Sequence, residues 1–253
     1  SSFIQILKSV QRVLTSDRNT VVIWTPLVRQ IMDADAPDHK LALLTFMHEL
    51  VHVEDQRVFD KTFPGGWQAA APRDARDHAM QTIVNPCQSE YSAQRRSAHM
   101  APRAGFALLD MLEDALRDVD AQITSERRAY RLHGNVEQFW TVARERLRFL
   151  FQAIGYGLGH ADYVASAADE HPELAAEYST RMEVLAALPK GWLLDACREA
   201  VQPFFLIQNW TNMEIYDPLE DVLEQLLNQY GVFSSIQEGD LYLDMPYNSI
   251  AEL

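Results

Sequence analysis

One short motif inside a strongly helical run is the part of the sequence best suited to chemistry. Residues 48–52 read His-Glu-Leu-Val-His, the HExxH pattern. On an α-helix, residues four apart lie on the same face, so His48 and His52 can offer two imidazole nitrogens to one metal ion. Glu49 would then lie beside the ion, placed to take a proton from a water molecule that the ion activates. The motif therefore predicts a zinc site with Glu49 as general base.

The residues around the motif predict that its helix is buried. The run from Leu41 to Phe59 contains no Gly or Pro, and its apolar residues fall on nearly every face. Burying two histidines and a glutamate is costly unless something binds them, and a shared cation is the simplest partner. The alternative is a pair of core histidines that ordinary hydrogen bonds satisfy.

A catalytic zinc site needs a third protein ligand and one open position. A second helix is predicted from Asn85, with Asn85 as N-cap, Pro86 in the first turn and Gln88 completing a capping box. On this helix Glu90 shares a face with small or polar residues that allow another helix to approach closely. We therefore expect Glu90 to be the third ligand. The residues that share its face are Ala93, Gln94 and Ser97.

These two motifs resemble the gluzincin type of zinc metallopeptidase. In that family the HExxH helix is followed by a helix whose Glu is the third ligand, with a small residue three positions later, as in Glu90-Tyr91-Ser92-Ala93 here. The resemblance covers roughly residues 20–100 and implies zinc bound by His48, His52 and Glu90. The metzincin class is excluded because Val58 stands where its third ligand would be. Several gluzincins have an Asp four residues after the glutamate ligand, where this sequence has Gln94.

Further roles around the metal can be assigned only as candidates. Metal-bound histidines usually donate their second N–H to a carboxylate or carbonyl, and Asp55, three residues beyond His52 on the same face, is the best candidate. The alternative for Asp55 is a solvated acidic helix end. A tyrosine or histidine is expected to stabilise the oxyanion. The candidates for that role are Tyr91, His78, Tyr130, His133 and His160.

The rest of the chain predicts a mainly α, α+β fold. A helix is expected over 3–15 and a strand over 20–24, followed by the motif helix. After residue 106 the pattern is almost entirely helical, with a short strand near 241–246. The glycines at 155, 157 and 159 lack a preceding strand, so we interpret them as a loosened helix or close helix packing rather than a nucleotide loop. We expect a zincin-like region over 1–103, with a small sheet and the active-site helix, and a helical bundle over 104–253. Later helices are expected over 106–132, from 135, and over 172–188, 191–208 and 218–230.

Composition narrows the classes of partner. A chain of 253 residues with 47% hydrophobic content can form a substantial core. The net charge of −14 disfavours nucleic acid and anionic membranes as partners. The two cysteines fit a reducing compartment, and no run of about 18 uncharged apolar residues predicts a membrane span. These features favour a cytoplasmic protein without a leader, although the N-terminus could be trimmed.

Three functions compete at this point. The first is a zinc-dependent peptidase that acts on a peptide or protein substrate. The second is carboxylate-bridged di-iron chemistry, which needs a second ExxH pattern; no other histidine has a glutamate three residues before it. The third is a zincin-like metal-binding protein without catalysis, whose helical half binds a protein partner.

Overall fold

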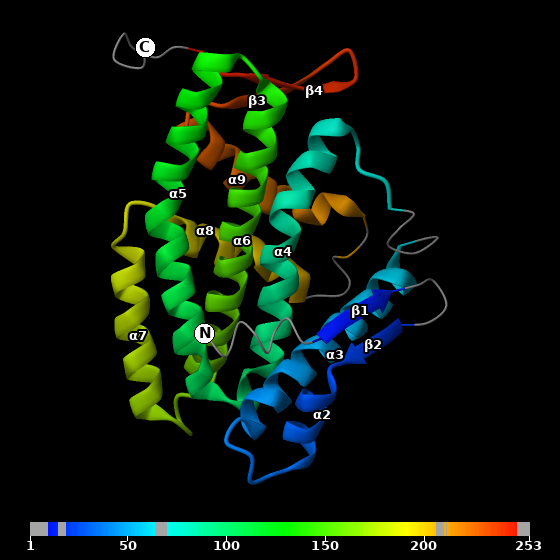
Figure 1. The fold of residues 1–253 in the computed structure, drawn as a ribbon, viewed down its shortest axis with the longest axis vertical. Helices are drawn as coiled ribbons and strands as arrows, with labels where there is room; N and C mark the ends of the chain where they lie inside the picture. The colour runs from blue at the N-terminus through cyan, green and yellow to red at the C-terminus, as the bar shows by residue number, and fades with distance from the viewer. Residues whose placement is uncertain (1–9, 15–18, 64–69, 206–209, 211, 247–253) are drawn as a thin grey trace. The chain divides into compact units, whose positions relative to one another are not determined.

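The computed structural model describes residues 10–14, 19–63, 70–205, 210 and 212–246. Over these residues the protein is mainly α-helical and carries two small antiparallel sheets of two strands each (Figure 1). This confirms the predicted α+β class with a predominance of helix. The helices are α2 (Thr25–Met32), α3 (His39–Thr62), α4 (Ala75–Ser97), α5 (Phe106–His133), α6 (Val136–Ser166), α7 (Pro172–Ala186), α8 (Trp192–Val201) and α9 (Asp217–Gln229). The strands are β1 (Val10–Leu14), β2 (Asn19–Ile23), β3 (Phe233–Gln237) and β4 (Asp240–Asp244).

The chain forms two compact units, each built from separated stretches. The first comprises 1–70, 89–111 and 155–184, and the second comprises 71–88, 112–154 and 185–253. This division differs from the predicted boundary near residue 103. The physical reason is helix length: α4, α5 and α6 each contribute residues to both units, so no single point in the chain separates them.

The first unit begins with a β-hairpin rather than the expected N-terminal helix. β1 pairs antiparallel with β2, with Val10 opposite Ile23 and Leu14 opposite Asn19. The prediction of a helix over 3–15 is therefore wrong for residues 10–14, and residues 3–9 lie outside the described residues. β2 confirms the strand predicted over 20–24. The two β-branched valines of β1 suit a strand once β2 supplies hydrogen-bonding partners, which a local helical period cannot reveal.

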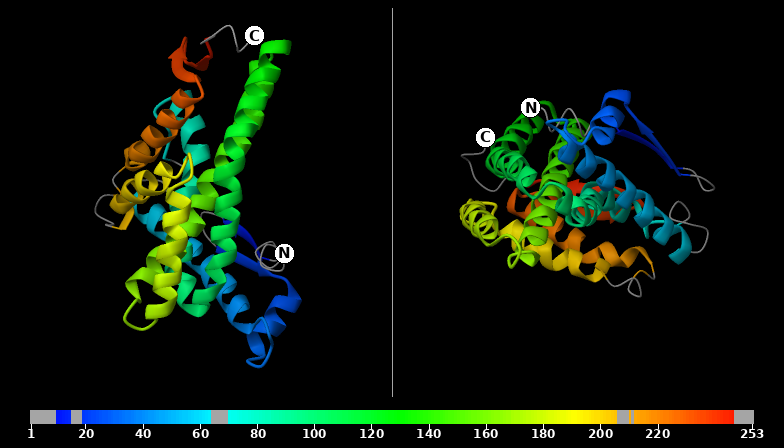
Figure 2. Two further views of the ribbon diagram at one scale, coloured as in Figure 1. Left: turned by 90° about the vertical axis from the view of Figure 1, so that its left-hand side faces the viewer. Right: turned by 90° about the horizontal axis from the view of Figure 1, so that it is seen from below.

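Helix α2 connects this hairpin to the motif helix. Leu27 of α2 and Ala42 of α3 are fully buried against each other's helices, with Ile23, Ile31 and Leu41 packed around them. The hairpin stays beside α2 and α3 in both turned views (Figure 2). Helix α2 was not predicted, because the strand over 20–24 was expected to be followed by the motif helix. Pro26 lies in the first turn of α2, where its missing N–H costs no hydrogen bond.

Helix α3 confirms the predicted motif helix and extends it at both ends. It runs without interruption for 24 residues, and its buried positions include Leu44, His48, Val51, His52 and Phe59. Asp38 occupies the N-cap position as expected, but its side chain makes no capping hydrogen bond. The helix ends at Thr62, as the following Pro and Gly predict.

Helix α4 starts eleven residues before the position predicted for it. Asp74, not Asn85, provides the cap: its carboxylate accepts a hydrogen bond of 2.8 Å from the backbone N–H of Asp77. The segment up to Val84, expected to be mixed, is helical, and Pro86 lies inside the helix. An interior proline removes one backbone hydrogen bond, but the helix continues because both flanks are buried.

Helices α5, α6, α7 and α9 lie close to their predicted ranges, whereas the helix predicted over 191–208 is α-helical only over Trp192–Val201, continues as a 3-10 turn over Gln202–Phe205, and at 206–208 lies outside the described residues. Gly134, at a φ of 68°, ends α5, and the Asn135 side chain caps α6 by accepting a 3.0 Å hydrogen bond from the N–H of Gln138. Helix α6 runs through all three glycines, confirming the interpretation as helix. Strand β4 confirms the predicted terminal strand. Its partner β3, which is mostly exposed, was not anticipated.

No helix in the described ranges has an apolar stretch long enough to cross a membrane.

A buried group of carboxylates joins two helix starts in the second unit. Arg73 bridges Asp77 and Asp217, with Nη2 lying 2.6 Å from an oxygen of each. Glu220 is 3% exposed, and its carboxylate lies beside Asp77 and Gln81. Burial, with the nearby charge of Asp77, raises the pKa of Glu220 to about 8. Glu220 is therefore mainly protonated near neutral pH.

We expect Glu220 to make the fold less stable as the pH rises. The folded chain keeps a proton on Glu220 that the unfolded chain releases near its ordinary pKa of 4.5. Its contribution to the free energy of unfolding is therefore complete below that value and is lost as the pH rises through about 8. Glu220→Gln should flatten this decline in chemical denaturation curves between about pH 4 and 9, a range that brackets both pKa values. Asp221→Asn, an exposed neighbour, should leave it unchanged; parallel pH profiles for wild type and Glu220→Gln would contradict the assignment.

Candidate metal centre

Three side chains from two helices of the first unit converge on one point. The Nε2 atoms of His48 and His52 are 3.1 Å apart, and Oε2 of Glu90 lies 3.0 Å from the first and 3.3 Å from the second. The exposed fractions are 1% for His48, 5% for His52 and 7% for Glu90. This is a buried group that could hold a metal ion, formed by the three residues predicted as ligands.

The separations of the three atoms fit a small tetrahedral ion. Ligands that bind zinc at 2.0–2.1 Å in tetrahedral geometry lie roughly 3.3 Å from one another. The observed 3.0, 3.1 and 3.3 Å approach that spacing, and the two imidazole planes are nearly perpendicular at 80°. Two nitrogen donors and one carboxylate form a ligand set that zinc accepts.

A chain of hydrogen bonds runs from His48 to the backbone of Pro102. Nδ1 of His48 lies 3.1 Å from Oε1 of Gln94, and Nε2 of Gln94 lies 2.7 Å from Nδ1 of His160. Nε2 of His160 lies 2.7 Å from the carbonyl oxygen of Pro102, which also accepts a 2.9 Å hydrogen bond from the Tyr178 hydroxyl. We call the His48–Gln94–His160–Pro102 series the histidine relay.

The chemistry of its last member fixes the direction of every bond in the histidine relay. A carbonyl can only accept, so Nε2 of His160 must carry a proton. Burial lowers the pKa of His160 to about 4, which leaves Nδ1 unprotonated at neutral pH. Gln94 must therefore donate its amide N–H to His160 and turn its oxygen to His48. His48 then carries its proton on Nδ1, and the lone pair of Nε2 points into the metal centre.

Close helix packing holds the relay in place. A Cβ atom on Gly159 would lie 2.5 Å from the carbonyl oxygen of Tyr91, so only glycine lets α6 approach α4 this closely. A Cβ on Gly105 would lie 2.3 Å from both the His160 ring and the Tyr178 hydroxyl. Both glycines therefore allow the close packing that brings His160 within hydrogen-bonding distance of Gln94 and Pro102.

The second histidine ligand has a different partner from the one predicted. Nδ1 of His52 lies 3.0 Å from the hydroxyl oxygen of Ser89, the residue before Glu90. Asp55 instead accepts a 2.8 Å hydrogen bond from Arg96. This corrects the assignment of Asp55 as the residue that orients a histidine. Helical side chains lean toward the N-terminus, so the outer nitrogen of His52 meets α4 rather than the following turn of α3.

Electrostatics at the centre favour an ionised carboxylate. Burial alone would raise the pKa of Glu90, but hydrogen bonds and charge from His48 and His52 outweigh it and hold the pKa well below its usual range. That effect needs a proton on a ring nitrogen facing Glu90; with both Nε2 atoms unprotonated, two imidazole lone pairs and an anionic oxygen would face one another at close range. Such a group repels itself unless a proton or a cation lies between its members.

Glu49 follows His48 on α3 and is 6% exposed, so it belongs to the same buried region. It directly follows His48 in the chain, and its role as general base stays a prediction. Tyr156, which sequence reasoning did not single out, stacks on His48 with ring centroids 5.7 Å apart and fixes the face of the imidazole.

The oxyanion candidates are engaged elsewhere or belong to the second unit. The Tyr91 hydroxyl donates a 2.6 Å hydrogen bond to Asp162, and burial raises the pKa of Tyr91. Both ring nitrogens of His160 are used by the histidine relay. His78, His133 and Tyr130 lie in stretches assigned to the second unit, and His133 accepts a hydrogen bond from the N–H of Asn135.

Sequence reasoning missed the positioning roles of Ser89 and His160. Ser89 could have been found as a hydroxyl directly before the glutamate ligand. His160 carried no local signal, because 66 residues separate it from Gln94.

Comparison with protein-family models, with curated proteins and with solved structures gave no match.

Replacing Gln94 by glutamate tests the direction of the histidine relay. A glutamate carboxylate can only accept, so His160 would need protons on both nitrogens and become an imidazolium. We expect Gln94→Glu to raise the pKa of His160 from about 4 by about 1 to 3 units, measured by NMR titration of the ring. Gln94→Met, of similar size and uncharged, should leave that pKa low. An unchanged pKa in Gln94→Glu would contradict the assigned direction.

Proposed function

We propose that the protein is a zinc-dependent peptidase of the gluzincin type. The observation that carries this proposal is the convergence of His48, His52 and Glu90 at 3.0–3.3 Å, from an HExxH helix and a following helix. The β1–β2 hairpin ahead of α3 is in keeping with a zincin-like core. The substrate class proposed is a peptide or protein.

The side chains around the centre would have separate roles in binding the ion and in proton transfer. When bound, zinc would polarise a scissile carbonyl and acidify a water molecule. His48 and His52 would hold the ion through Nε2, each oriented by a hydrogen bond on its outer nitrogen, to Gln94 and Ser89 respectively. Glu49 would accept the proton from the attacking water and pass it to the leaving amine. Burial of these side chains lowers the local dielectric and strengthens each charge interaction.

A second candidate function is a closed metal site without catalysis, in a protein that binds a partner. The burial of the ligands favours it, because all three are less than one-tenth exposed and structural zinc sites are closed to solvent. The two candidates differ in the role of Glu49: catalysis requires its carboxylate as a base, whereas a structural site does not.

Metal content tests the basis of both candidates. After incubation with zinc and removal of excess, we expect about one zinc ion per chain by elemental analysis. His48→Ala and Glu90→Ala should lose most of it, because each removes one of three ligands. His99→Ala, which removes an exposed histidine of the same unit, should retain it. A wild-type protein that binds no zinc would overturn the metal assignment.

Glu49→Gln separates the two candidates. The amide keeps the size of the side chain but cannot accept the proton, so we expect the variant to bind zinc normally and to lose cleavage of a mixed-sequence peptide library. Glu54→Gln, an exposed glutamate on the same helix, should cleave as wild type does. Equal cleavage by Glu49→Gln and wild type would exclude Glu49 as the base. A zinc-loaded wild type that cleaves nothing would favour the closed metal site.

A further inference from the structure

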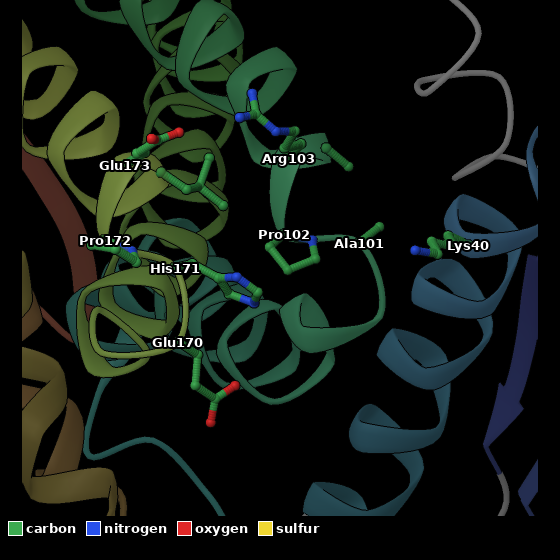
Figure 3. Close-up of a pocket in the computed structure, with 10 residues that line it drawn as sticks. Lys40, Ala101, Pro102, Arg103, Glu170, His171, Pro172 and Glu173 are labelled. Carbon is green, nitrogen blue, oxygen red and sulfur yellow. The ribbon is translucent and has the colours of Figure 1, made fainter.

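The first unit contains a pocket of about 540 Å³, open to solvent, that the proposed chemistry does not use and that we call the cavity. Its walls come from the start of α3, from the turn at 101–104 and from the connection at 170–174 that leads into α7. Figure 3 shows Lys40 on one side of the cavity and His171 pointing toward it from the other, with Pro102 between them. The volume falls within the range of small-molecule sites.

Opposite charges face this cavity from different walls. Lys40 extends from α3, and its side chain forms no ion pair with any other described residue. Glu170 and Glu173 come from the segment across the cavity from Lys40, where they flank His171 in Figure 3, and are likewise without an ion pair in the described ranges. Arg103 adds a second cation, held only by a loose 3.5 Å contact with exposed Glu177. The cavity therefore offers a cation to one end of a ligand and carboxylates to the other.

The floor of the cavity is apolar and is continuous with the packing behind the metal centre. Ala101 and Ala104 line the cavity and also pack on the buried pair Leu44 and Leu108, as does Tyr156. Tyr156 in turn stacks on His48. The Pro102 carbonyl that ends the histidine relay belongs to a residue of the cavity wall.

We propose that this cavity binds a short zwitterionic peptide, with its carboxylate at Lys40 and its ammonium group at Glu170 and Glu173. The inference rests on the proposed peptidase function for the origin of such a ligand, and it narrows the substrate class to peptides held by a free terminus. The apolar floor suits an aliphatic side chain, and the separated charges select against ligands that carry only one sign.

Binding of the dipeptide alanyl-leucine to the full chain tests the proposal by isothermal titration calorimetry. A chelator is present throughout, so that the result does not depend on zinc. We expect the free dipeptide to bind, and acetylation of its amine or amidation of its carboxylate to weaken binding about tenfold or more, because each removes a charged hydrogen bond. Lys40→Gln and Glu173→Gln should weaken it similarly. The matched controls Lys61→Gln on α3 and Glu183→Gln on α7 should not.

Three outcomes would overturn the site. One is that the free dipeptide does not bind. Another is that a dipeptide with both an acetylated amine and an amidated carboxylate binds with the same affinity as the free dipeptide. The third is binding that survives Lys40→Gln but is lost in His48→Ala, which would locate the peptide at the metal centre. That last result would leave the proposed peptidase intact. Conversely, dipeptide binding by a protein that takes up no zinc in the metal-content experiment would support the cavity while the peptidase proposal failed.

Discussion

The carbonyl of Pro102 can only accept hydrogen bonds, and the arrangement of the metal centre follows from this limit. It requires a proton on Nε2 of His160 and leaves Nδ1 of that ring as an acceptor for the Gln94 amide N–H. The Gln94 oxygen then faces His48, whose proton is therefore on Nδ1. The His48 nitrogen that faces His52 and Glu90 is thereby left unprotonated. In many metal sites a carboxylate orients a histidine; here the neutral side chain of Gln94 orients His48.

The two units bury charged groups by different means. In the first, lone pairs from His48, His52 and Glu90 are directed at one point, which suits a cation. In the second, Arg73 binds two carboxylates and Glu220 retains its proton. The difference lies in the contacts: a guanidinium binds the oxygens of Asp77 and Asp217, whereas the imidazole nitrogens of His48 and His52 face the Glu90 oxygen. The buried polar groups of the first unit thus suit a bound cation, whereas an arginine and a retained proton reduce the buried negative charge of the second.

From the sequence, we could predict which side chains share one face of a helix. We could not predict contacts between residues that are far apart in the chain. His48, His52 and Glu90 were identified because spacing on a helix places side chains on a face, even though the start of α4 was placed at Asn85 rather than near Asp74. A face depends only on the local helical period. Residues 10–14 were misread because the preference for a strand comes from pairing with β2. Ser89 and His160 act across helices, where spacing within one helix carries no information.

Gly105 and Gly159 lie where a single added carbon would collide with the histidine relay or with the backbone of α4. Neither contributes a side-chain atom to the metal centre, yet at each position any larger residue would collide with its neighbours. In evolutionary terms, the sites near the centre least free to vary include residues that touch no ligand. We therefore expect both glycines to be conserved as strictly as the residues that carry the donor atoms. A relative that had lost either glycine would need other contacts to orient His48.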